Sequence, residues 1–141
     1  MIKMEKIVFI GLSNKKDKEP FDISTNSGKI IHDIIKELNY DCYKLNLVPY
    51  VPLTKEGKLR YPTKEEIKES MPLLKKELRE INPNCIISLG NVVSKELKKI
   101  KEYQNIILFE NHPSYIYVYK RKELDEYKKR IIEKIKKKVG E

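Results

Sequence analysis

The feature that most constrains the fold is an alternation of two patterns along the chain. Short, nearly continuous apolar runs alternate with stretches in which apolar residues recur at helical spacing. A continuous apolar run is typical of a strand buried on both faces, as in a parallel sheet. Such runs predict strands at 6–12, 42–48, 84–90 and 105–110.

The intervening stretches predict helices. Thr25, Asn26 or Ser27 is expected to cap the first helix, and a capping-box pattern at 63–66 starts the second, which Pro72 is expected to kink or split. A short helix is predicted around 92–100 and a longer one around 122–139. Strands that alternate with helices predict an α/β fold: a three-layer α/β/α sandwich with a central four-stranded parallel sheet, in a single domain over 1–141.

Composition narrows the classes of function. The net charge of +9 favours a polyanionic partner, although a solvated lysine-rich surface explains it equally well. No signal peptide opens the chain and no apolar run is long enough to span a bilayer. Cys42 and Cys85 lie in apolar runs and predict buried free thiols, which favours a reducing, cytoplasmic setting. The two His and two Cys show no metal-ligand spacing, so neither a metal nor a cofactor is expected.

Polar residues gather where the predicted strands end. In an open parallel sheet the ligand site lies beyond the carboxyl ends of the strands. Those ends are 11–14, 46–50, 90–91 and 111–114. We therefore expect a binding site formed by these four segments.

Three side chains near this edge are candidates for chemistry, each with a structural alternative. Asn46 interrupts an apolar strand and could recognise a polar ligand edge or satisfy backbone groups. His112 could act in catalysis or be a structural residue in the turn at Pro113. Phe21 follows Pro20 in a polar loop and either plugs the core edge or offers a stacking face.

Two glycines and three tyrosines are less specific candidates for binding. Gly28 and Gly90 lie near helix starts and could cradle a phosphate, although glycine also serves ordinary turns. Tyr115, Tyr117 and Tyr119 alternate, which predicts an extended segment that offers an aromatic face or packs against the sheet.

Taken in order, these segments resemble the uracil-DNA glycosylase superfamily over nearly the whole chain. The matching pieces are IGLSN, PFDISTNSGKIIHDII, KLNLVPYVP, the stretch from RYPTKEE to NCIISLG, and NHPSYIYVYKR. Residues 44–90 are most similar to the iron–sulfur branch. The resemblance implies a DNA glycosylase that flips a base out of DNA and acts on it in a pocket.

The resemblance also implies roles for individual residues. Phe21 would stack on the base, Asn46 would recognise its Watson–Crick edge, and His112 would stabilise the departing base anion. Gly11 would line the base pocket. Contacts to DNA phosphates would come from Ser114, Gly28, Gly90, Lys120 and Arg121.

Two departures from the family pattern stand out. Tyr50 and Ser70 occupy the internal positions where the iron–sulfur branch has cysteine ligands, so no cluster is expected. Leu12 and Ser13 stand where relatives carry the group that positions the attacking water. Ser13 or Asn14 is expected to orient that water, unless Asp17 or Glu19 reaches in from the loop.

Three hypotheses follow. The first is hydrolysis of the N-glycosidic bond of uracil, or of another deaminated base, by a monomer. The second is a nucleic-acid-binding relative with weak or no catalysis. The third is a small-molecule hydrolase or nucleotide-binding protein on the same fold. Ile116 and Tyr117 are the expected residues for insertion into the vacated base stack.

Overall fold

The computed structural model describes residues 4–15 and 18–140. Its centre is a parallel sheet in the order β2-β1-β3-β4, which confirms the predicted sheet. The strands are β1 (Lys6–Ser13), β2 (Asp41–Val48), β3 (Cys85–Leu89) and β4 (Ile107–Glu110). Because all four run in the same direction, their carboxyl ends lie at one edge of the sheet.

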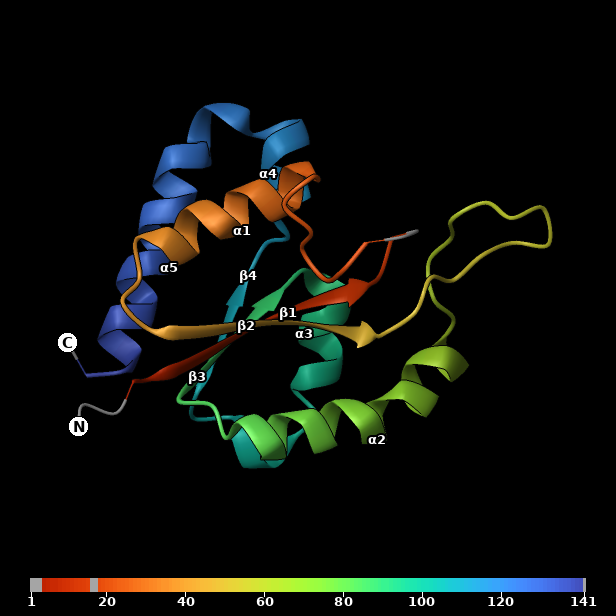
Figure 1. Cartoon of the computed structure of the whole chain (residues 1–141), viewed down its shortest axis with the longest axis horizontal. Helices are drawn as coiled ribbons and strands as arrows, with labels where there is room; N and C mark the ends of the chain where they lie inside the picture. Colours follow the sequence, from red (N-terminus) through yellow and green to blue (C-terminus); the bar gives the residue numbers. More distant parts are fainter. Residues whose placement is uncertain (1–3, 16–17, 141) are drawn as a thin grey trace.

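Helices cover both faces of the sheet (Figure 1). One face carries α1 (Asn26–Lys36), α4 (Pro113–Tyr119) and α5 (Leu124–Lys138). The other carries α2 (Lys64–Ile81) and α3 (Asn91–Leu97). Two 3₁₀ turns, η1 (Lys101–Tyr103) and η2 (Arg121–Glu123), complete the elements. This is the predicted three-layer α/β/α sandwich.

Alternate side chains of each inner strand enter different cores. Ile7 and Phe9 of β1 are buried against α1, α4 and α5, whereas Val8 and Ile10 are buried in the core beneath α2 and α3. A strand with both faces buried needs apolar residues at every position. The continuous apolar runs in the sequence therefore mark the strands.

Local signals decide how the helices begin. Thr25 Oγ1 accepts the Gly28 amide at 2.9 Å and caps α1. Thr63 and Glu66 form the predicted capping box at the start of α2. Pro72 lies within α2 without splitting it, contrary to one of the two expectations.

Residues 113–119 form a helix, so the extended segment expected from the alternating tyrosines was wrong. Pro113 occupies the first turn, where its missing N–H costs nothing, and His112 caps the helix. Ile116 is buried and gives the helix its inward face. Tyr115 and Tyr119, one turn apart, have ring centroids 5.4 Å apart. The last long helix begins at Leu124, after η2, two residues later than predicted.

The loop between β1 and α1 is held against the start of its own helix. A Cβ placed on Gly28 would lie 1.7 Å from the Asp22 carbonyl oxygen, so only glycine allows this approach. The contact fixes the loop that contains Phe21, which adopts a left-handed backbone with φ of 50°. In the described part of the chain, no helix is long and apolar enough to cross a membrane.

The first prediction concerns this packing. Gly28→Ala should lower the free energy of unfolding by about 3 kcal/mol, because the new methyl group collides with backbone that cannot move aside. Gly57→Ala is the matched control: that site has a positive φ but open space, and we expect a loss of about 1 kcal/mol there. Urea unfolding measures both. Equal losses would contradict the proposed role of the close approach.

Candidate active site

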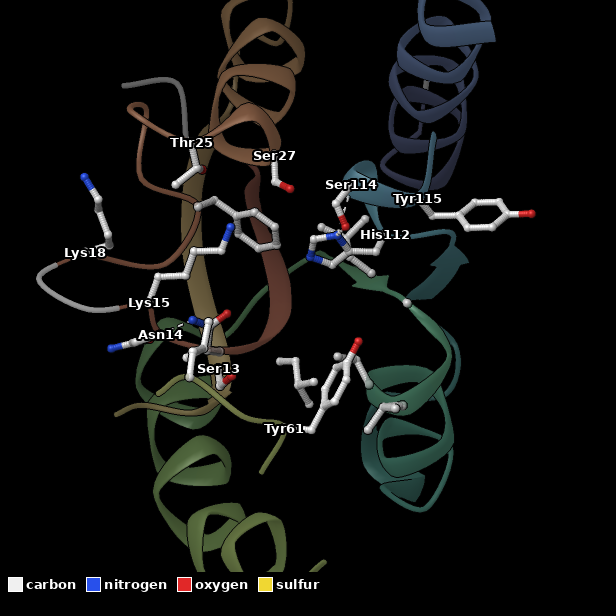
Figure 2. A pocket seen from close by; sticks show the side chains of 18 of the residues that line it. Ser13, Asn14, Lys15, Lys18, Thr25, Ser27, Tyr61, His112, Ser114 and Tyr115 are labelled. Carbon is white, nitrogen blue, oxygen red and sulfur yellow. Dashed lines mark hydrogen bonds between the residues drawn. The ribbon is translucent and has the colours of Figure 1, made fainter. Parts of the chain in front are cut away.

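A pocket of about 660 Å³ opens at the carboxyl edge of the sheet (Figure 2). Each strand contributes to it, directly or through the residues that follow it. Their contributions include Ser13, Asn14, Asn46, Leu89, Gly90, His112 and Ser114. The structure therefore brings together, at one pocket, residues from the segments that were expected to meet beyond the carboxyl ends of the strands.

Gly11 lies where two predicted site residues meet the sheet. It pairs in register with Asn46 on the neighbouring strand. A Cβ at Gly11 would lie 2.6 Å from Asn46 Oδ1 and 2.8 Å from Phe21 Cζ. Any side chain at position 11 would thus displace the amide, the phenyl ring or both. Gly11 allows these two groups to converge.

The Asn46 amide is buried and held in one orientation. Its Nδ2 donates to Asn14 Oδ1 at 2.7 Å, and Oδ1 is the atom that faces Gly11. One Nδ2 hydrogen and the Oδ1 acceptor have no other partner among the described residues. Asn46 can therefore offer a donor and an acceptor side by side.

His112 has its proton placed by the helix that it caps. Its Nδ1 accepts the Ser114 backbone N–H at 3.1 Å, so Nδ1 carries no hydrogen and the proton of the neutral ring is on Nε2. Nε2 faces the pocket (Figure 2), and the ring stacks on Phe21 with centroids 5.8 Å apart. Burial, with a smaller effect from the charge of Lys15, lowers the pKa of His112 to about 4. At neutral pH the pocket thus contains a neutral N–H donor.

A small hairpin between β2 and α2 forms one side of the pocket, and it projects from the body of the molecule (Figure 1). Arg60 anchors it by donating to both carboxylate oxygens of Glu66, at 2.6 and 3.1 Å. Tyr61 points from it into the pocket and is 82% exposed (Figure 2). Sequence reasoning missed Tyr61, since the only signal was an aromatic residue in a long polar loop.

The predicted phosphate contacts fall into different settings. Ser114 lines the pocket, and its hydroxyl bonds His112 Nδ1 at 2.8 Å. The Gly28 amide is already used by Thr25, and the Gly90 amide donates to the Glu110 carbonyl. Neither amide is free to cradle a phosphate.

Two predicted contacts lie apart from the pocket lining, at the end of α4. Lys120 is exposed. Arg121 packs over the Tyr117 ring, 4.0 Å from its centroid, and donates to the Tyr117 carbonyl oxygen. Of the alternative water activators, Glu19 pairs with Lys44 at 3.0 Å, and Asp17 lies outside the described residues.

A scan against protein families gives a match over residues 3–136, to the uracil DNA glycosylase superfamily. The chain belongs to the uracil DNA glycosylase superfamily. The resemblance noted in the sequence is thereby confirmed, and membership supports a glycosylase-type function that acts on DNA. No curated protein matches the sequence significantly.

A solved structure gives independent support for the fold. The crystal structure of wild-type Pedobacter heparinus SMUG2 matches with a TM-score of 0.74 at 16% sequence identity. The match covers 95% of this chain and 76% of the SMUG2 chain. At this identity the similarity establishes the shared fold only.

The iron–sulfur cluster of one branch of the superfamily does not fit the residues present here. Such clusters are held by cysteine thiolates. Tyr50 and Ser70 stand at the two internal ligand positions, and Tyr50 Oη instead bonds Glu66. Cys42 and Cys85 lie on different strands, and burial raises their pKa values to about 11 and about 12, so both remain thiols. The described residues contain no group of three or more metal-binding side chains.

The residues expected to enter the base stack are differently placed. Ile116 is buried, and Tyr117 packs against the core. On the same helix, Val118 and Tyr119 are 64% and 74% exposed and line the pocket. A helix turns its neighbouring residues in different directions, so the shift from strand to helix changes which side chains face outward.

The pKa of His112 gives a prediction about stability. Its folded value of about 4 lies below the ordinary value of 6.5, so between these pH values the unfolded chain binds more protons. The free energy of unfolding should therefore fall as the pH drops from 6.5 to 4. His112→Asn removes the titration but keeps an N-cap side chain.

Urea unfolding at pH 7.0 and 4.5 tests this. The Asn variant should lose less stability on acidification than the parent. Some loss should remain, because burial also lowers the pKa of His32. Identical losses of unfolding free energy in the parent and the variant would contradict the lowered pKa of His112.

Proposed function

We propose that this chain hydrolyses the N-glycosidic bond of uracil, or of another deaminated base, in DNA and leaves an abasic site. The observation that supports this most is a convergence of three groups on one pocket. Phe21 offers a ring, Asn46 a paired donor and acceptor, and His112 a neutral N–H. A planar base with a polar edge and an oxygen that gains charge suits all three.

Base recognition follows from the fixed amide of Asn46. Uracil and hypoxanthine each present an N–H beside a carbonyl oxygen. The Oδ1 acceptor can bind that N–H while the remaining Nδ2 hydrogen binds the carbonyl. Cytosine presents the opposite order, and the bond from Nδ2 to Asn14 Oδ1 opposes a flip of the amide. The proposed preference is therefore for deaminated bases.

Bond cleavage transfers electrons from the glycosidic bond to the base. The developing anion is proposed to accept the Nε2–H of His112, which needs no proton transfer to do so. The sugar becomes oxocarbenium-like and takes up a water at C1′. The Ser13 hydroxyl and the free Nδ2 of Asn14 are the groups proposed to orient that water, and both residues line the pocket.

DNA is the proposed partner, bound by a monomer with the target nucleotide flipped out of the helix. Ser114 is proposed to contact a flanking phosphate, and Lys120 and Arg121 add positive charge at the end of the same helix. Gly28 and Gly90 are proposed only to let DNA approach the backbone closely. Their amides donate to other groups of the chain and do not bind a phosphate. Val118 and Tyr119 replace Ile116 and Tyr117 as the proposed wedge.

One observation favours the second hypothesis, a relative with weak catalysis. The described pocket lining has two carboxylates, Glu19 and Asp22. Glu19 pairs with Lys44, and Asp22 accepts two hydrogen bonds from Ser24. A water activated only by neutral groups predicts slow turnover.

The central experiment uses an oligonucleotide that contains one uracil, with alkali to cut the abasic sites. Removal of a donor to a developing anion costs about 10²–10³-fold in rate, and we expect losses of that order for His112→Ala and Asn46→Ala. His32→Ala and Asn105→Ala are matched controls outside the pocket lining. Intact strands with uracil, hypoxanthine and xanthine at high enzyme concentration would rule out the glycosylase. Salt-dependent binding without cleavage would favour the second hypothesis.

The wedge gives a separate prediction. Tyr119→Ala should slow excision from duplex DNA by about tenfold, the equivalent of one lost stacking contact. Excision from single-stranded DNA should change little, because no stack has to be filled there. Equal slowing on both substrates would assign Tyr119 to general binding instead.

A further inference from the structure

The hydrolytic scheme assigns no role to the amine of Lys15, one of the polar groups of the pocket. Lys15 follows the end of β1 and lines the pocket. Its side chain extends across the pocket on the side of His112 (Figure 2). Among the described residues, no hydrogen bond or ion pair engages the amine. Lys18 also borders the pocket, but its Nζ donates to Ser24 Oγ at 2.7 Å and points away.

Lys15 lines the pocket in which the scheme places the reacting sugar carbon. A base oxygen that accepts the Nε2–H of His112 would lie about 2.9 Å from Nε2. The ring carbon that bears this oxygen is bonded to the glycosidic nitrogen, so C1′ lies only a few bonds further on. The charge of Lys15 already acts on His112. A flexible lysine at this place can reach a sugar at the pocket mouth.

We propose that Lys15 is the nucleophile of a second activity, cleavage of the DNA strand at the abasic site. The product of base excision is in equilibrium with an open-chain aldehyde at C1′, and lysine amines form Schiff bases with carbonyl groups. This activity builds on the proposed glycosylase, whose product is its substrate.

The reaction balances without an oxidant or a reductant. The ammonium group of Lys15 first gives a proton to water. The lone pair of the resulting neutral amine attacks C1′, and the carbonyl oxygen takes up a proton. Loss of water then gives a protonated imine. A water removes the C2′ proton, the electron pair forms the C2′–C3′ double bond, and the C3′–O bond breaks with release of the 5′-phosphate strand. Hydrolysis of the imine returns the free amine.

The test uses an oligonucleotide with a preformed abasic site, which makes it independent of base excision. With borohydride present, the imine is reduced to a stable amine and the protein becomes linked to the DNA. Lys15→Arg keeps the charge but cannot form the imine, and we expect its adduct yield to fall by about tenfold or more. Lys18→Arg is the matched control and should retain the parent yield. Without reductant, the parent should cut the strand before any alkali is added.

The outcomes separate this inference from the proposed function. Uracil excision without an adduct on abasic DNA overturns the inference and leaves the glycosylase in place. An adduct on abasic DNA without uracil excision supports the inference and overturns the proposed glycosylase. Equal adduct yields from the parent and Lys15→Arg also overturn the inference. Mass spectrometry of the digested adduct should place the added mass on the peptide that contains Lys15. Matching circular dichroism spectra would show that the variants are folded.

Discussion

The candidate site depends on a close approach of two side chains to a residue without a Cβ. Gly11 lies in β1, one of the two inner strands of the sheet, and Asn46 and Phe21 both reach the space that a side chain at position 11 would fill. One comes from the neighbouring strand and the other from the loop held by Gly28. The candidate pocket is thus set by backbone packing, which a rigid parallel sheet maintains better than a mobile loop.

The structural role of His112 and its proposed chemical role depend on each other. Because Nδ1 accepts the Ser114 N–H to cap α4, the proton of the ring must lie on the nitrogen that faces the pocket. Burial then keeps the ring neutral near pH 7. His112 thus has a structural role, as the cap of α4. That same role fixes the N–H donor that the proposed chemistry needs.

The sequence predicted the fold better than the details of the site. Buried strands and the capping box leave local signals, whereas the convergence of Gly11, Phe21 and Asn46 becomes visible only once the strand order places them together. The tyrosines at 115–119 misled because their period of two competes with a stronger local signal, His-Pro at a helix start. Lys15 and Tyr61 had no pattern to single them out, since charged and aromatic loop residues are common.

The charges around the pocket shape how a reaction there would proceed. The two carboxylates of the described lining are bonded to other groups, while the charge of Lys15 acts on His112. A pocket with this balance favours an anion that leaves and disfavours a cation that forms. In the proposed reaction, stabilisation of the sugar cation would come from DNA phosphates, which the net charge of +9 would help to bind. In the proposed sequence, the aldehyde that Lys15 attacks forms only after water has added to the sugar cation. Base loss would therefore precede strand cleavage.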